Sequence, residues 1–194
     1  MPPKVCAAGG DFEVDENGEI DVDGDGAPDI DVDRIAYLGA SLGGIMGAEL
    51  LALSPHVRAA VLTVAGGRLA SILQDGNQFS IVLDFVVPVT TLVLARALGT
   101  PHLPPVLRDA GLLPKEAELP MSGNLEEGSL TAGLFQFDRV TLRPGGRPEA
   151  AQHNNTVSSM EMGNQAFRFL ESWIEDDVPE VIDPYELLGT RPLP

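Results

Sequence analysis

The sequence predicts an α/β protein with a mostly parallel sheet flanked by helices. Residues 34–39 (RIAYLG) and 57–65 (VRAAVLTVA) are short apolar runs rich in strand-forming residues. The segment between them, 42–53 (LGGIMGAELLAL), places Leu42, Ile45, Met46, Leu50 and Leu53 on one stripe of a helix. Apolar strands that alternate with helices are typical of a parallel sheet covered on both faces. A chain of 194 residues that is 44% hydrophobic can bury a core of its own.

The rest of the chain adds further strands and helices. Apolar runs predict strands at 78–83 and 129–137, and 89–98 predicts a helix that begins after a proline and ends before a glycine. A last helix is expected from about residue 155 to Ile174, with a core-facing side formed by Met160, Phe167, Leu170 and Ile174. Stretches rich in Pro and Gly are expected to be loops, at 99–125 and 138–152.

Charge divides the chain into three parts. Residues 1–33 form an acidic N-terminal segment, 34–175 the α/β domain, and 176–194 an acidic, Pro-rich C-terminal tail. The net charge of −17 repels phosphate backbones, so we expect no nucleic-acid partner. The longest apolar run, 79–98, contains charged residues and is interpreted as core rather than as a transmembrane segment. The single cysteine excludes an internal disulfide.

The most specific motif is Gly39-Ala40-Ser41-Leu42-Gly43, a G-x-S-x-G between a predicted strand and a predicted helix. This context places a nucleophilic serine on a sharp strand-to-helix turn. The helix N-terminus then directs backbone N–H groups, that of Leu42 among them, at a developing oxyanion. The alternative is a glycine-rich turn with an inert serine.

With its flanks, YLGASLGG and the later VLTVAGG, this motif resembles the elbow of α/β-hydrolases, specifically of bacterial lipases and esterases. The resemblance covers about residues 34–175 and matches only the C-terminal half of that fold, so the chain would be a truncated α/β-hydrolase-like protein. It implies that Ser41 is the nucleophile of a Ser-Asp-His triad in that chain order.

The acid of the triad is assigned to Asp84. It ends a predicted strand and precedes a Val-Val-Pro turn, as in the family, and rigid structure is what a triad acid requires. Asp75 is the alternative, although it lies in a predicted turn without a strand before it. The neighbouring Phe85 and Val86 are expected to contact an acyl group.

The base must be one of three histidines. His56 follows the far end of the elbow helix, about 20 Å from Ser41 at 1.5 Å per residue. His102 lies in a proline-rich loop soon after Asp84. His153 precedes the last helix, where the family keeps its catalytic histidine, and it is assigned as the base.

The acidic segment contains a D-x-D-x-D-G-x-x-D pattern that resembles a calcium loop. Alternate carboxylates can converge on one hard cation. The twelfth position is Val32 rather than the Glu of an EF-hand, and a solvated linker is the alternative. A structural Ca²⁺ would be held by Asp21, Asp23, Asp25, Asp29 and Asp31.

These observations predict a serine hydrolase that cleaves carboxyl esters, as an esterase or lipase on a small-molecule or polymeric (polyester) substrate, without a catalytic cofactor. Because the strands that precede the elbow strand in the family are absent here, its open edge favours a homodimer, and the alternative is that the N-terminal acidic segment covers this edge. We expect an extracellular or exported protein, although no signal peptide is present. The alternative function is a non-catalytic calcium-binding fragment or an assembly domain of a larger hydrolase.

Overall fold

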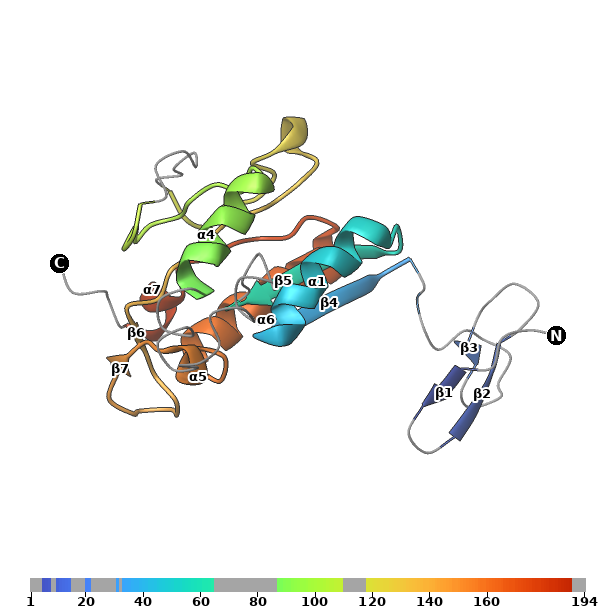
Figure 1. Ribbon diagram of the computed structural model, residues 1–194, viewed down its shortest axis with the longest axis horizontal. Helices are drawn as coiled ribbons and strands as arrows, with labels where there is room; N and C mark the ends of the chain where they lie inside the picture. The colour runs from blue at the N-terminus through green and yellow to red at the C-terminus, as the bar shows by residue number, and fades with distance from the viewer. Residues whose placement is uncertain are drawn as a thin grey trace, which may run out of the picture.

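The protein is a mixed α/β structure in which helices pack around a small parallel sheet (Figure 1). The predicted α/β class is therefore confirmed at this level. The computed structural model describes residues 5–7, 10–14, 20–21, 31, 33–64, 87–109 and 118–189, with backbone only for 5–7, 10–14, 20–21 and 87–90.

The centre of the fold is one strand-helix-strand unit. It consists of β4 (Ile35–Ala40), α1 (Leu42–Leu53) and β5 (Val57–Thr63), as the sequence predicts. The two strands pair in parallel, with Ala40 opposite Thr63. Because α1 supplies the crossover between them, it packs against both strands.

Helix α1 faces the sheet with its glycines rather than with its leucines. Gly44 and Gly47 are buried, and a Cβ on Gly47 would clash with the Tyr37 ring. The apolar stripe that predicted this helix is not its core face, because most of the stripe is exposed, namely Leu42, Met46, Leu50 and Leu53. The tyrosine ring fills the space that leucines would otherwise need, and the helix approaches closely enough for Tyr37 Oη to donate to the Gly43 carbonyl at 2.7 Å.

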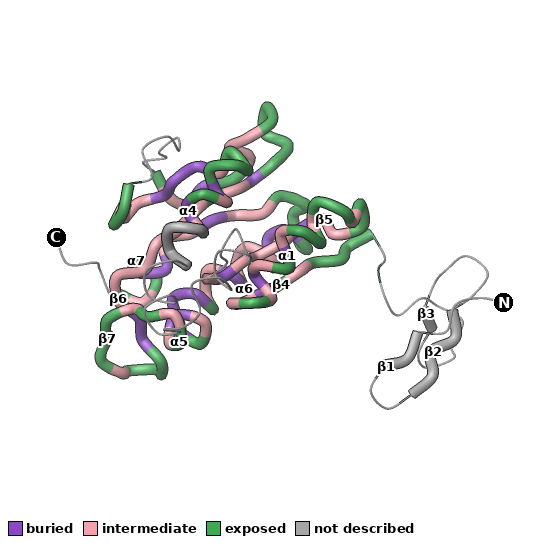
Figure 2. The backbone as a smooth tube through the Cα atoms, in the orientation of Figure 1, coloured by how far each residue is buried: buried purple, intermediate pink, exposed green. Residues whose placement is uncertain are grey.

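The remaining described strands are antiparallel. The N-terminal strands β1 (Val5–Ala7), β2 (Gly10–Val14) and β3 (Ile20–Asp21) form a three-stranded sheet. A short hairpin pairs β6 (Arg139–Val140) with β7 (Glu149–Ala150), within a stretch expected to be loop. Figure 2 shows that this hairpin is largely exposed. Parallel pairing is thus observed for β4 and β5 alone among the described strands.

Helix α4 (Val87–Ala97) occupies the predicted position. It ends where Gly99 adopts φ +67° and Thr100 N donates to Ala95 O at 2.9 Å. A left-handed glycine is the usual way to close a last helical turn. The strand expected at 78–83 lies outside the described residues.

The prediction of a strand at 129–137 is wrong. Its backbone makes only isolated bridges, including His102 with Leu134. The Asn124 side chain pairs with Ala132 in both directions, with Nδ2 donating to the carbonyl at 2.9 Å and Oδ1 accepting from the amide at 3.0 Å. These side-chain hydrogen bonds take the place of the backbone hydrogen bonds that a strand would make. The short 3-10 helix η3 (Glu126–Gly128) lies between the two residues that they join.

The last predicted helix is divided in two. Helix α5 (His153–Thr156) precedes α6 (Met160–Asp176), because Ser159 caps α6 by accepting from Met162 N at 3.2 Å. The expected core positions Phe167 and Ile174 are exposed. The inner face of α6 is formed instead by other side chains, with Met162, Ala166 and Trp173 buried.

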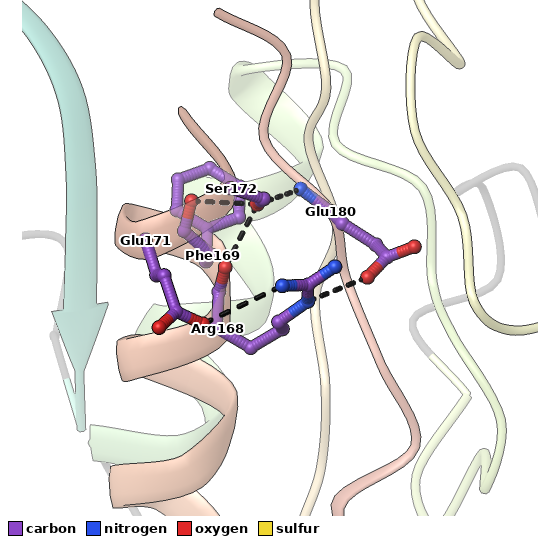
Figure 3. A network of polar contacts seen from close by, with 5 residues as sticks. All are labelled: Arg168, Phe169, Glu171, Ser172 and Glu180. Carbon is purple, nitrogen blue, oxygen red and sulfur yellow. Dashed lines mark hydrogen bonds and ion pairs between the residues drawn. The ribbon is translucent and has the colours of Figure 1, made fainter. Parts of the chain in front are cut away.

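Contacts from α6 fasten the segment that follows it (Figure 3). Ser172 Oγ donates to Arg168 O at 2.7 Å and accepts from Glu180 N at 2.8 Å. Arg168 Nε donates to Glu180 Oε2 at 2.7 Å, and this hydrogen bond raises the pKa of the guanidinium. In the segment after α6, Val181 pairs with Met121. The side chains of Val181, Met121 and Leu103 form a buried cluster.

The chain from 176 onward contributes α7 (Pro184–Leu188). Its Tyr185 is fully buried against Phe135 and Phe137, at ring-centroid distances of 5.8 and 6.2 Å. The Tyr185 hydroxyl accepts from Asp138 N at 3.0 Å and lies 3.0 Å from Asp138 Oδ1 and 3.1 Å from Arg139 O. Burial raises the pKa of this phenol.

Candidate active site

Ser41 occupies a sharp turn between β4 and α1. Its backbone has φ 52° and ψ −116°, outside the regions that a residue with a Cβ ordinarily adopts. Two hydrogen bonds hold it there: Ser41 N donates to Thr63 O at 3.1 Å, and Ile45 N donates to Ser41 O at 3.0 Å. The turn is therefore fixed on one side by β5 and on the other by the first turn of α1.

Close packing explains the first glycine of the motif. A Cβ on Gly39 would lie 2.5 Å from Tyr37 Cε1 and 2.6 Å from the Gly43 carbonyl oxygen. Gly43 differs, since a Cβ there would meet only Tyr37 Oη at 3.7 Å, an ordinary contact. Gly39 is thus required by space, whereas Gly43 is not.

The side chain of Ser41 is directed at a histidine. Serine is a favoured N-cap, yet the Ser41 side chain makes no capping hydrogen bond to α1. Its Oγ lies instead 2.9 Å from His153 Nε2, within hydrogen-bond distance. The two residues are separated by 112 positions in the sequence, so tertiary structure creates this pair.

The geometry around the pair suits a nucleophile and its base. Leu42 is the first residue of α1, so its N–H has no acceptor within the helix. The positive end of the helix dipole lies beside Ser41 Oγ, where negative charge on a bound carbonyl oxygen would be stabilised. His153 is half-buried, and its Nδ1 is shielded from solvent.

The other two histidines lie elsewhere. His56 is exposed just before β5, beyond the far end of α1. His102 is fully buried, and within the described part of the chain neither of its ring nitrogens has a hydrogen-bond partner. His102 belongs to the buried stretch 101–103.

Asp84, the alternative Asp75, and the expected contact residues Phe85 and Val86 lie outside the described residues.

Most of the predicted calcium ligands also lie outside the described side chains. These are Asp21, Asp23, Asp25 and Asp29. Asp31 is described: its Oδ1 accepts from Asp33 N at 3.0 Å and its Oδ2 lies 3.5 Å from Arg34 Nε. Among the side chains that are described, no group of three His, Cys, Asp or Glu could hold a metal ion.

Arg34 ties the start of β4 to the C-terminal end of α6. Its guanidinium donates to the Ile174 carbonyl and, at 3.1 Å, to Asp177 Oδ1. Both acceptors lie at the C-terminal end of α6, where the helix dipole favours a cation.

A cavity of about 700 Å³ extends from His153. Apolar side chains of three elements dominate its described walls, among them Leu62 of β5, Leu92 and Ala95 of α4, and Ala166 and Phe169 of α6. The sequence did not predict these wall residues as a site. Apolar residues at helical spacing in α6 indicate a helix that packs against the core. The space between α6 and α4 arises only in the tertiary structure, so the sequence does not indicate it.

Comparison with protein-family profiles, with curated proteins and with solved structures finds no match to this chain. In the described part of the chain, no helix combines the length and the apolar character needed to traverse a bilayer.

Proposed function

We propose that this protein is a serine hydrolase that cleaves carboxyl esters through an acyl-enzyme, with Ser41 as nucleophile and His153 as general base. One observation carries the proposal: Ser41 Oγ lies 2.9 Å from His153 Nε2 while the Ser41 backbone is held at φ 52°. A serine within hydrogen-bond distance of an imidazole can act as a nucleophile, and a strained strand-to-helix turn is one arrangement that exposes such a serine.

The mechanism follows from this geometry. His153 Nε2 takes the hydroxyl proton as Ser41 Oγ attacks the ester carbonyl carbon. The Leu42 N–H donates to the oxygen that becomes negative. When the C–O bond breaks, His153 returns the proton to the leaving alcohol. A water molecule then attacks the acyl-enzyme with His153 again as base, which releases the acid and regenerates Ser41.

Asp84 remains the proposed third member of the triad. Its role would be to orient the His153 ring and to stabilise the imidazolium that forms. The proposal of an α/β-hydrolase-like fold rests on the elbow motif and on its strand-helix-strand setting. Similarity to bacterial lipases and esterases belongs to the same proposal.

The apolar cavity beside His153 supports the proposal that the acyl group of the ester substrate is apolar and binds there. About 700 Å³ of mostly apolar space is enough for a medium acyl chain. Burial of each CH₂ is worth about 0.8 kcal/mol, so the specificity constant should rise as the acyl chain lengthens until the cavity is filled.

Hydrolysis of p-nitrophenyl butyrate tests the proposal. Wild type, Ser41→Ala and Ser54→Ala are compared, the last being a serine at the opposite end of α1 that serves as the matched control. We expect turnover by wild type and Ser54→Ala, and loss of at least 10³-fold in Ser41→Ala. Equal turnover by Ser41→Ala, or folded wild type without turnover, would contradict the proposal.

Assays with added calcium and with chelator address the alternative function. A calcium-binding fragment or assembly domain should gain thermal stability from calcium while showing no turnover that depends on Ser41. An esterase with a structural calcium should show both properties.

A further inference from the structure

One amide side chain makes three hydrogen bonds in the turn that carries His153. Helix α5 has only four residues, too few to be stable by itself. Within it, Asn155 Oδ1 accepts from Gln152 N at 2.7 Å. Asn155 Nδ2 donates to Ala150 O at 2.9 Å and to Glu149 Oε1 at 3.0 Å. Both ends of the amide are therefore engaged, and they join α5 to strand β7.

These contacts bracket His153 along the backbone. Gln152 directly precedes it, and the Gln152 carbonyl accepts from Thr156 N at 3.0 Å and from Thr156 Oγ1 at 2.8 Å. Ala151 N donates to Asp138 O at 2.9 Å. A rotation of the His153 backbone would disturb the contacts of Asn155, because they join residues on both sides of His153 to each other and to β7.

We propose that Asn155 is a positioning residue for His153: its amide fixes the turn so that Nε2 stays within hydrogen-bond distance of Ser41 Oγ. The inference rests on the proposed function, since a fixed imidazole matters for reaction only if His153 is the base. A displacement of about 1 Å in a reacting group can cost roughly 100-fold in rate.

Two neighbouring asparagines provide a matched test. Asn155→Asp keeps the acceptor for Gln152 N, removes both donated hydrogen bonds, and places a carboxylate against the Ala150 carbonyl and Glu149. Asn154→Asp makes the same change of charge one residue away, at an exposed side chain with no hydrogen bond among the described residues. We expect kcat to fall about 10- to 100-fold in Asn155→Asp with KM within twofold, and to change less than threefold in Asn154→Asp.

A second substitution tests the hydrogen bond itself. Glu149→Gln added to Asn155→Asp supplies an amide donor to the new carboxylate and should recover part of kcat. The same change added to Asn154→Asp should have no effect. Recovery in both backgrounds would indicate a general effect of charge and would overturn the proposal.

The position of the imidazole can be measured without turnover. The sequence has only three histidines, so ring ¹⁵N NMR spectra are simple, and His153→Ala assigns the signal. We expect the His153 ring signals to shift in Asn155→Asp and to remain in place in Asn154→Asp. Unchanged His153 signals in both variants would overturn the positioning role. Absence of turnover in folded wild type would overturn the proposed function alone, because the NMR comparison still decides the role of Asn155.

Discussion

At Ser41 the chain holds a backbone conformation that costs of order 1–3 kcal/mol for a residue with a side chain. The surroundings compensate for this cost. Thr63 and Ile45 fix the Ser41 peptide groups from two elements, and Gly39 lets Tyr37 and the Gly43 carbonyl close around the turn. Strain of this kind persists only where the neighbouring structure determines it, and at Ser41 it supports the proposed role of this residue as a nucleophile.

Substitution of Gly47 by alanine tests the close approach of α1 to the sheet. The new Cβ would clash with the Tyr37 ring and lie 2.9 Å from Leu62 Cδ2, so we expect the free energy of unfolding to fall by about 1–3 kcal/mol. Gly163→Ala in α6 is the control, because its Cβ would meet nothing within 4 Å. That variant should gain about 0.5–1 kcal/mol. Urea unfolding measures both, and equal effects would refute the account of glycine packing.

At the scale of elements, α7 is anchored by Tyr185, and this anchor should give the fold an alkaline limit. Burial raises the Tyr185 pKa above its ordinary value of 10.0, so the folded state holds the phenolic proton more tightly than the unfolded state. The stabilisation is complete below pH 10 and is lost as pH rises above it, at up to about 1.4 kcal/mol per pH unit.

Tyr185→Phe separates this effect from the other groups that titrate in alkali. The variant loses the hydrogen bonds to Asp138 and should be less stable at pH 7 by about 1–2 kcal/mol. Its stability should then fall less steeply between pH 10 and pH 11.5 than that of wild type. Parallel curves of melting temperature against pH would show that Tyr185 does not set the limit.

Prediction from sequence succeeded where local signals were strong. The β4–α1–β5 unit follows from apolar runs, helical spacing and glycines, and its boundaries match the prediction closely. Chain order led to the pairing of Ser41 with His153, and their side chains lie 2.9 Å apart, while their roles remain proposals. The outward face of α1 could not be predicted, because an aromatic ring that packs against glycines leaves no periodic signal.

Errors arose where side chains replaced backbone pairing. The run at 129–137 has the composition of a strand, but Asn124 pairs with it through its amide. The break before α6 depends on Ser159, one of two adjacent serines at 158–159 that could both cap a helix. The Asn155 amide bonds two backbone groups, Gln152 N and Ala150 O, and no spacing rule in the sequence indicates these contacts.

For the whole molecule, the outer edge of β4 is the feature that invites association. Among the described strands β4 pairs with β5 alone, and Leu38 on it is 58% exposed. An edge strand with exposed apolar side chains is a template for pairing with another chain. The net charge of −17 opposes self-association and is screened by salt.

We therefore expect a homodimer that is favoured at 0.5 M NaCl over 0.05 M, measured by size-exclusion chromatography with light scattering. Leu38→Lys should yield a monomer under both conditions. Leu53→Lys changes a leucine that is 84% exposed at the far end of α1, and it should leave the dimer intact. A wild type that is monomeric at every salt concentration would contradict the expectation.

The central claim, that Ser41 and His153 form a nucleophile and its base, is tested most directly by covalent labelling with an alkyl fluorophosphonate, followed by intact-mass and peptide mass spectrometry. We predict a single adduct on Ser41 in wild type, none in Ser41→Ala, and labelling slowed by roughly 10²-fold or more in His153→Ala. Folded wild type that stays unlabelled, or that is labelled at the same rate without His153, would contradict the claim.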